Sequence, residues 1–184
     1  MEKKNNQIDS SQLDLITAAT LALALQEDDK PITQVWVNKN LVRSKTSLYN
    51  DNYEIINKST EIKIAIYPST KEYYKIDGFN DKLLDFVDSI KLASELPIKF
   101  VEGEEKTIAG YTCKLAKIVL KQEENNTIGI NIWYNEYLPQ AYWGEYAYLK
   151  KIPGAALEIS TSGIGIQAYQ IKPDDDVNIF KIPD

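Results

Sequence analysis

The chain has 184 residues and a formal net charge of −6, with 21 lysines and arginines against 27 aspartates and glutamates. It contains no histidine and a single cysteine, Cys113. This composition excludes a Ser–His–Asp or Cys–His relay, a histidine-ligated metal, an internal disulfide and a multi-cysteine cluster. The acidic balance argues against binding to nucleic acid, which requires a basic surface.

The chain length predicts one domain, which we place at residues 13–184 after a polar, flexible arm at 1–12. No apolar run approaches the roughly 18 residues that a membrane span needs. The first residues carry charge but no apolar stretch follows them, so the chain as given shows no signal peptide. Either the protein is cytoplasmic or an export signal has been removed.

Short strands separated by turn residues dominate the first half. Residues 15–26 favour a strand, with an alanine-rich helix as the alternative. A hairpin is expected over Ile32–Val37 and Leu41–Tyr49, around a turn at Asn38–Asn40. Ile62, Ile64 and Ile66 alternate with polar or small residues and therefore predict one apolar face of a strand. Further strands are expected at 53–57 and 71–76, a spacing typical of a sandwich or barrel.

One helix is predicted at about 81–95, capped by Asn80 or Asp81, with Leu83, Val87 and Ile90 on its apolar side. The strand pattern then returns. It predicts strands at 98–101, 107–122 and 127–135, an acidic turn at 102–105, and a hairpin formed by 155–161 and 164–171. The fold class is therefore mainly β (α+β), with about ten strands and one main helix.

Seven aromatic side chains gather between positions 133 and 148, which is the strongest local anomaly of composition: Trp133, Tyr134, Tyr137, Tyr142, Trp143, Tyr146 and Tyr148. Tyrosine and tryptophan combine a flat apolar face with a polar tip. The rings could line an apolar cavity, form an exposed platform for a sugar or a protein, or simply pack over the open end of the β structure.

Other features indicate no specific chemistry. Cys113 lies in a predicted strand and is expected to be buried. Arg43, the only arginine, has either a buried carboxylate partner or a solvated position. The acidic run at 174–176 lacks the glycine of a calcium loop. No nucleophile elbow or phosphate loop is present. We therefore expect no catalysis, no cofactor and no metal.

Three segments of the second half carry a family resemblance: Thr107-Ile-Ala-Gly-Tyr-Thr-Cys-Lys-Leu-Ala-Lys117, Ile132-Trp-Tyr134 and Leu149-Lys-Lys-Ile-Pro-Gly-Ala-Ala-Leu-Glu158. They resemble the GLPGLI-type exported family of Gram-negative envelopes and its relatives. The resemblance covers residues 105–184. The Gly-Leu that gives the family its name is Lys151-Ile152 here.

The resemblance implies a fold similar to lipoprotein carriers of the LolA/LolB type, a strongly curved antiparallel sheet or half-barrel with helices over its concave face. It also implies a location in the periplasm or cell envelope. It supplies no catalytic residue. The matching positions are expected to define the fold: Gly110, Cys113, Trp133, Pro153 and Gly154.

The first functional hypothesis is non-catalytic binding of a lipid-like or other apolar ligand, such as a lipoprotein acyl chain, in a cleft between sheet and helix. The candidate ligand-binding residues are Ile62, Ile64, Ile66, Trp133, Tyr137, Tyr142, Trp143 and Tyr146. An alternative is an interaction module that binds glycan or an envelope protein, with Tyr142, Trp143 and Tyr146 exposed on one patch. A purely structural role and a hydrolase with two facing carboxylates are further alternatives.

Overall fold

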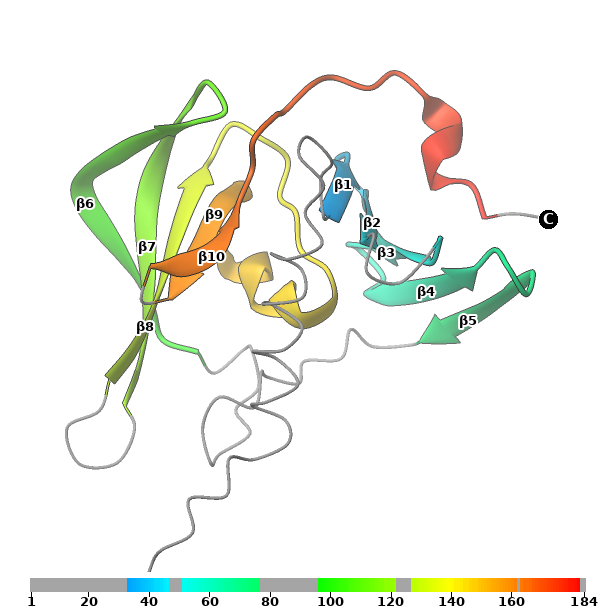
Figure 1. Cartoon of the computed structure of the whole chain (residues 1–184), viewed down its shortest axis with the longest axis horizontal. Coiled ribbons are helices and arrows are strands. Elements are labelled where there is room, and N and C mark those ends of the chain that lie inside the picture. Colours follow the sequence, from blue (N-terminus) through cyan, green and yellow to red (C-terminus); the bar gives the residue numbers. More distant parts are fainter. Residues whose placement is uncertain (1–32, 47–50, 77–95, 122–126, 162, 183–184) are drawn as a thin grey trace, which may run out of the picture.

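The structure is a computed structural model that describes residues 33–46, 51–76, 96–121, 127–161 and 163–182. Within these ranges the chain forms ten strands, arranged as two antiparallel five-stranded sheets that do not close into a barrel (Figure 1). The prediction of a mainly β, antiparallel fold is confirmed. The predicted helix at 81–95, the arm at 1–12 and the segment at 15–26 lie outside the described residues.

The first sheet is a simple meander in which each strand pairs with the next along the chain. Its strands follow the order β1-β2-β3-β4-β5. Their bounds are β1 Thr33–Val37, β2 Leu41–Thr46, β3 Tyr53–Asn57, β4 Ile62–Tyr67 and β5 Glu72–Ile76. The hairpin expected around Asn38–Asn40 is present, because this turn joins β1 to β2.

The second sheet has the order β10-β9-β8-β7-β6. Its strands are β6 Ile98–Ile108, β7 Tyr111–Lys121, β8 Thr127–Asn135, β9 Ala155–Thr161 and β10 Ile164–Gln167. The hairpin of β9 and β10 was expected, although β10 ends at Gln167 and not at 171, and β8 has the predicted bounds. All four pairings within this sheet are antiparallel.

Two predictions for β6 and β7 were wrong. The segment 107–122 is not one strand, because Ala109 (φ 48°) and Gly110 (φ 85°) turn the chain between the two strands. Positive φ at both central residues is the geometry of the tight turns that suit hairpins. The acidic segment 102–105 does not end a strand either. It is an irregularity within β6, where the register shifts between Val101 and Glu105.

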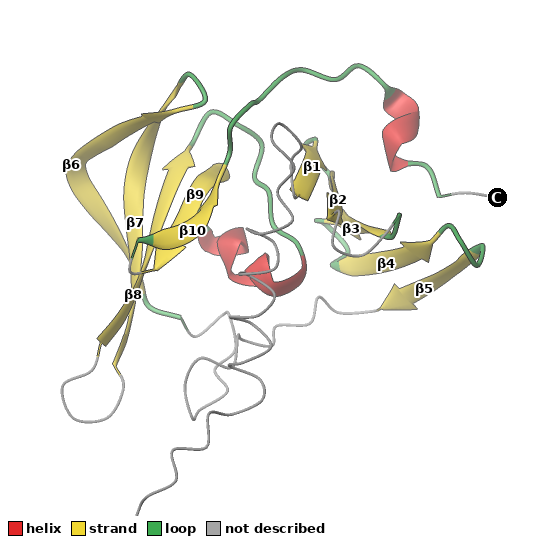
Figure 2. Ribbon diagram, in the orientation of Figure 1, coloured by secondary structure: helices red, strands yellow, loops and turns green. Residues whose placement is uncertain are grey.

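A short 3₁₀ helix, η3 (Gly144–Lys151), lies between the two sheets (Figure 2). One buried cluster joins Val42 and Ile56 of the first sheet to Ile132 of β8 and to Tyr148 and Leu149 of η3. Full burial of a side chain of this size contributes about 1.5–3 kcal/mol. The aromatic segment therefore supplies part of the core that holds the sheets together. No helix among the described residues is long and apolar enough to cross a membrane.

The two faces of the first sheet have different surroundings. Val42 and Ile56 are opposite each other and point into the shared core. Arg43, Ile55 and Ile64 are aligned across three strands on the other face. Because side chains alternate along a strand, Ile62 and Ile66 share that second face. The isoleucine pattern of β4 therefore points away from the core between the sheets.

The C-terminal segment crosses from the second sheet to the first and ends in a second 3₁₀ helix, η4 (Val177–Phe180) (Figure 1). Arg43 holds it there, since its Nη1 donates to the carbonyl oxygen of Ile179 at 2.6 Å. The guanidinium also lies 4.0 Å from the ring centre of Tyr53 and 5.1 Å from that of Trp36. The partners of the single arginine are thus a carbonyl and two rings, and no carboxylate among the described residues pairs with it.

We expect Arg43→Lys to release η4 from the first sheet. A lysine lacks the planar fork that stacks between rings while donating to a carbonyl. A hydrogen bond to a charged group contributes about 1.5–3 kcal/mol, so unfolding free energy should fall by about 1–2 kcal/mol. Hydrogen–deuterium exchange should show faster exchange at residues 177–181, with β7 and β8 unchanged. Equal exchange in both proteins would contradict this role.

Candidate functional site

A surface depression lies where turns of the first sheet meet the loop that follows β8. Its volume is about 380 Å³, and its lining residues are Lys39, Lys58, Tyr137, Leu138, Pro139 and Gln140. Three separate parts of the chain contribute: the β1–β2 turn, the β3–β4 turn and the loop after Asn135. Tyr137 is the one aromatic residue of the sequence-based candidate set that lines it.

Each of the three parts is held by an asparagine in the same way. The Oδ1 atoms of Asn38, Asn57 and Asn135 each accept hydrogen bonds from the backbone N–H groups two and three residues further on, at 2.8–3.2 Å. Such side-chain turns fix the backbone without a regular element. Lys39 and Lys58 directly follow their asparagines, and Tyr137 follows Asn135 by two residues. The walls of the depression are therefore pre-formed.

Lys58 joins two of these walls. Its Nζ donates to the carbonyl oxygens of Asn38 and Gln140, at 2.6 Å each. Burial lowers the pKa of the Lys58 amine from its usual value, because the protein replaces part of the water around the charge. An ammonium group has three donors, and these two carbonyls accept from two of them.

Gln140 connects the depression to η3. Its Nε2 donates to the carbonyl oxygens of Lys150 (2.6 Å) and Ile152 (2.8 Å). Both acceptors require an amide nitrogen, which fixes the orientation of the side chain and leaves Oε1 pointing away from them. Lys150 in turn pairs with Glu61 of the first sheet at 2.9 Å. Gln140 is thereby tied to η3, and η3 in turn to the β3–β4 turn of the first sheet.

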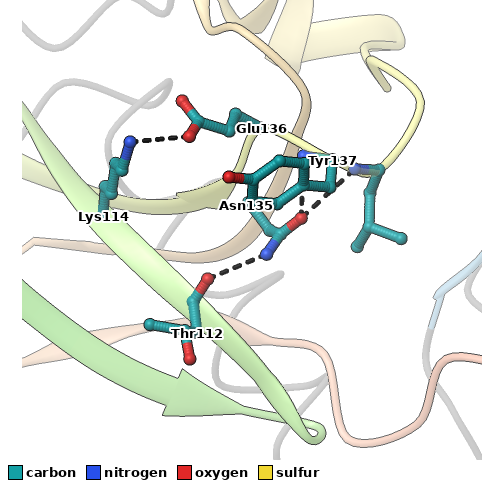
Figure 3. Close-up of polar contacts among 6 residues, drawn as sticks. Thr112, Lys114, Asn135, Glu136 and Tyr137 are labelled. Atoms are coloured by element: carbon teal, nitrogen blue, oxygen red, sulfur yellow. Dashed lines mark hydrogen bonds and ion pairs between the residues drawn. The ribbon is translucent and has the colours of Figure 1, made fainter.

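Asn135 sets the direction of the loop that carries Tyr137 (Figure 3). Its side chain is only 6% exposed, and its Nδ2 donates to the carbonyl oxygen of Thr112 at 2.8 Å. Gly154 lies against the same backbone: a Cβ at this position would be 2.1 Å from the carbonyl oxygen of Asn135. A glycine at position 154 is therefore needed for the start of β9 to pass this close to the end of β8.

Tyr137 is the most exposed large side chain of the described aromatic segment, with 87% of its surface accessible. Beside it, Lys114 and Glu136 form an ion pair at 2.7 Å (Figure 3). This pair raises the pKa of Lys114, because the carboxylate stabilises the charged amine. The region around Tyr137 thus offers an accessible ring next to an already neutralised pair of charges.

The other predicted aromatic site residues do not form an exposed platform, and that expectation was wrong. Tyr142 is 4% exposed and belongs to the core, and Trp143 and Tyr146 are partly buried against it. Trp133 is half-buried, with the Lys106 amine 5.8 Å from its ring centre. Packing is thus the role of most rings in the segment, which lie on β8, in η3 or directly before η3.

The predicted apolar positions of β4 are not gathered with those rings. Ile66 is 2% exposed and Ile62 and Ile64 are half-buried, all on the face of the first sheet that also carries Arg43. Trp133 and Tyr142 belong instead to the buried and half-buried packing around the second sheet and η3. The candidate set therefore divides between two regions.

Sequence reasoning missed Lys39, Lys58 and Gln140. The available signal was the repeated Asn-Lys pair, at positions 38–39 and 57–58, each in a turn of the first sheet. Cys113 is buried as predicted, and burial raises the pKa of its thiol. The described residues hold no group of three or more cysteine, aspartate or glutamate side chains placed to bind a metal ion.

Comparison of the chain with family models, with curated proteins and with solved structures finds no match. The resemblance to the GLPGLI-type family and to the lipoprotein carriers therefore stays a prediction. The geometry of the chain's own residues carries the functional argument.

Proposed function

We propose that the protein is a non-catalytic binding module that recognises a glycan at the depression lined by Lys39, Lys58, Tyr137 and Gln140. The observation that carries this proposal is the combination of an accessible tyrosine ring with polar groups held on three pre-formed turns. Pre-formed sites lose little conformational entropy on binding. The family resemblance supports a location in the cell envelope, where glycans are presented.

The size of the depression favours a sugar over a protein surface. Its volume of about 380 Å³ lies at the lower end of the range for small-ligand pockets, about 300–1,000 Å³. A stable protein interface instead buries about 800 Å² on each partner. Sugars combine apolar C–H faces with hydroxyl groups, which suits a site that offers a ring, Leu138 and Pro139 beside amide and ammonium groups.

Binding of an acyl chain has weaker support. That hypothesis needs an open apolar face, yet Ile132 of β8 lies in a buried cluster with Tyr142 and with Leu149 of η3. The candidate positions of β4 lie on another face, away from this cluster. The depression lined by Lys39, Lys58, Tyr137 and Gln140 is therefore the better-supported binding site.

The test is to screen the full chain against an array of neutral and acidic oligosaccharides, together with the variants Tyr137→Ala and Tyr73→Ala. Tyr73 lies on β5 and is also exposed, so it controls for the loss of one surface tyrosine. We expect Tyr137→Ala to weaken glycan binding about tenfold, which corresponds to about 1.4 kcal/mol. Tyr73→Ala should bind like the unmodified chain.

Two outcomes would overturn the proposal. The first is a folded protein that binds no oligosaccharide on the array. The second is glycan binding that both tyrosine variants retain, which would place the site elsewhere on the surface.

A further inference from the structure

The depression carries positive charge that the described residues do not neutralise. Five of the described lysines pair with carboxylates, in the pairs Lys45–Asp51, Lys63–Glu54, Lys106–Glu158, Lys114–Glu136 and Lys150–Glu61. Lys39 and Lys58 have no such partner among the described residues, and no acidic residue lines the depression. Lys39 and Lys58 differ from the other described lysines without a carboxylate partner in that they line one depression together, in a chain whose net charge is −6.

Lys58 is the more firmly held of these two amines. Two of its donors bind neutral carbonyl groups of Asn38 and Gln140, which hold the amine at the wall of the depression. Carbonyl dipoles offset only part of the cost of burying a charge, as the lowered pKa of this lysine indicates. An anion in the depression would accept from the third donor and would compensate the buried charge.

Lys39 lies on the neighbouring turn and lines the same depression. Its backbone is fixed, because the Oδ1 of Asn38 accepts from Asn40 N and Leu41 N, and Lys58 N donates to Asn40 O at 2.8 Å. The two amines therefore come from rigid turns that are bonded to each other. Gln140 adds its Oε1 acceptor, which suits a hydroxyl group.

We propose that the glycan recognised here is acidic, and that the depression holds the carboxylate of a uronic acid residue between Lys58 and Lys39. The carboxylate accepts from both ammonium groups, and the Gln140 Oε1 accepts from a ring hydroxyl of the same sugar. This inference rests on the proposed function, since it names the chemical class of the glycan.

The experiment is an NMR titration of the full chain with trigalacturonate and with its methyl ester, which keeps every ring hydroxyl but removes the charge. We expect the acid to bind at least about tenfold more tightly than the ester, with affinity falling as salt is added. The amides of residues 39, 58 and 140 should shift. Sodium acetate at the same concentration tests whether a carboxylate alone is sufficient, and we expect no measurable binding of acetate.

The variants Lys58→Met and Lys39→Met should each reduce binding of the acid about tenfold and bring it close to that of the ester. Lys99→Met is the matched control, because it removes one exposed lysine of β6 and changes the net charge equally. It should change affinity less than twofold. Lys39 is an exposed turn residue, so its variant folds even where loss of the Lys58 bridges destabilises the protein.

The outcomes separate this inference from the function on which it rests. Equal binding of acid and ester, or a Lys39→Met variant that binds the acid normally, would overturn the acidic specificity and leave glycan binding in place. A chain that binds neither compound and no glycan of the array would overturn both. Acetate binding as tight as that of trigalacturonate would show a simple anion site and would overturn recognition of a uronic acid.

Discussion

Replacing Gly154 by alanine should destabilise the protein severely, because a close backbone contact and a positive φ coincide at this residue. The new Cβ would lie 2.1 Å from the carbonyl oxygen of Asn135 and 2.7 Å from the Cα of Glu136. Both are backbone atoms, so no side-chain rotation can relieve the overlap. The residue also has φ +98°, which an L-amino acid with a side chain rarely adopts.

The expected loss in unfolding free energy is more than about 4 kcal/mol, a size reached only by severe steric or burial defects. A domain of this size has about 5–15 kcal/mol in total, so the variant should be close to unfolding at 37 °C. Urea denaturation followed by tryptophan fluorescence measures the change. The expected result includes a shift of the midpoint to much lower urea, with little change in slope.

Gly110→Ala is the matched control for backbone strain alone. Gly110 has a similar positive φ of +85°, but no atom lies within 4 Å of an added Cβ. Its cost should be only the conformational one, about 1–2 kcal/mol. If the two variants lose the same stability, the close approach of β9 to the end of β8 is not the reason for Gly154.

The strands and turns that could be predicted are those whose sequence pattern lies within a few neighbouring residues. The alternating isoleucines at 62, 64 and 66 and the turn residues at 38–40 act over a few positions, and both gave the correct strands. The Ala109–Gly110 turn was missed because the apolar-polar alternation of its flanks matches that of a continuous strand. The positive φ values of Ala109 and Gly110 show that the segment is a hairpin and not a continuous strand.

The division into two sheets could not be predicted, because it depends on contacts between distant segments. The aromatic segment was compatible with a cavity lining, an exposed platform or packing, and only the structure shows that Tyr142 and Tyr148 belong to the buried cluster that joins the sheets. A ring has the same sequence signature whether it is packed or exposed. The depression was missed for a related reason: its walls come from residues about 20 and 80 positions apart, as the bonds from Lys58 to Asn38 and Gln140 show.

The expected result for Asn135→Ala is a loss of both stability and glycan binding. The buried amide makes three hydrogen bonds, to Thr112 O, Tyr137 N and Leu138 N. Alanine would leave these three backbone groups without their partner, at a cost of about 1 kcal/mol each and about 3 kcal/mol in total. The loop that carries Tyr137 would no longer be fixed, so affinity for the glycan should fall at temperatures where the variant remains folded.

Two further variants separate the contributions of Asn135. Asn135→Asp keeps the acceptor for Tyr137 N and Leu138 N but places a carboxylate against Thr112 O. It should therefore be less stable than the unmodified protein and bind the glycan more tightly than Asn135→Ala. Asn38→Ala removes the equivalent pair of hydrogen bonds, which two backbone N–H groups donate to Oδ1, at an exposed turn where water replaces them, and should cost less than about 1 kcal/mol. Denaturation curves and titrations of all three variants measure both effects. If Asn135→Ala binds the glycan normally, the loop does not depend on this side chain, and the depression is held by the Lys58 and Gln140 bridges alone.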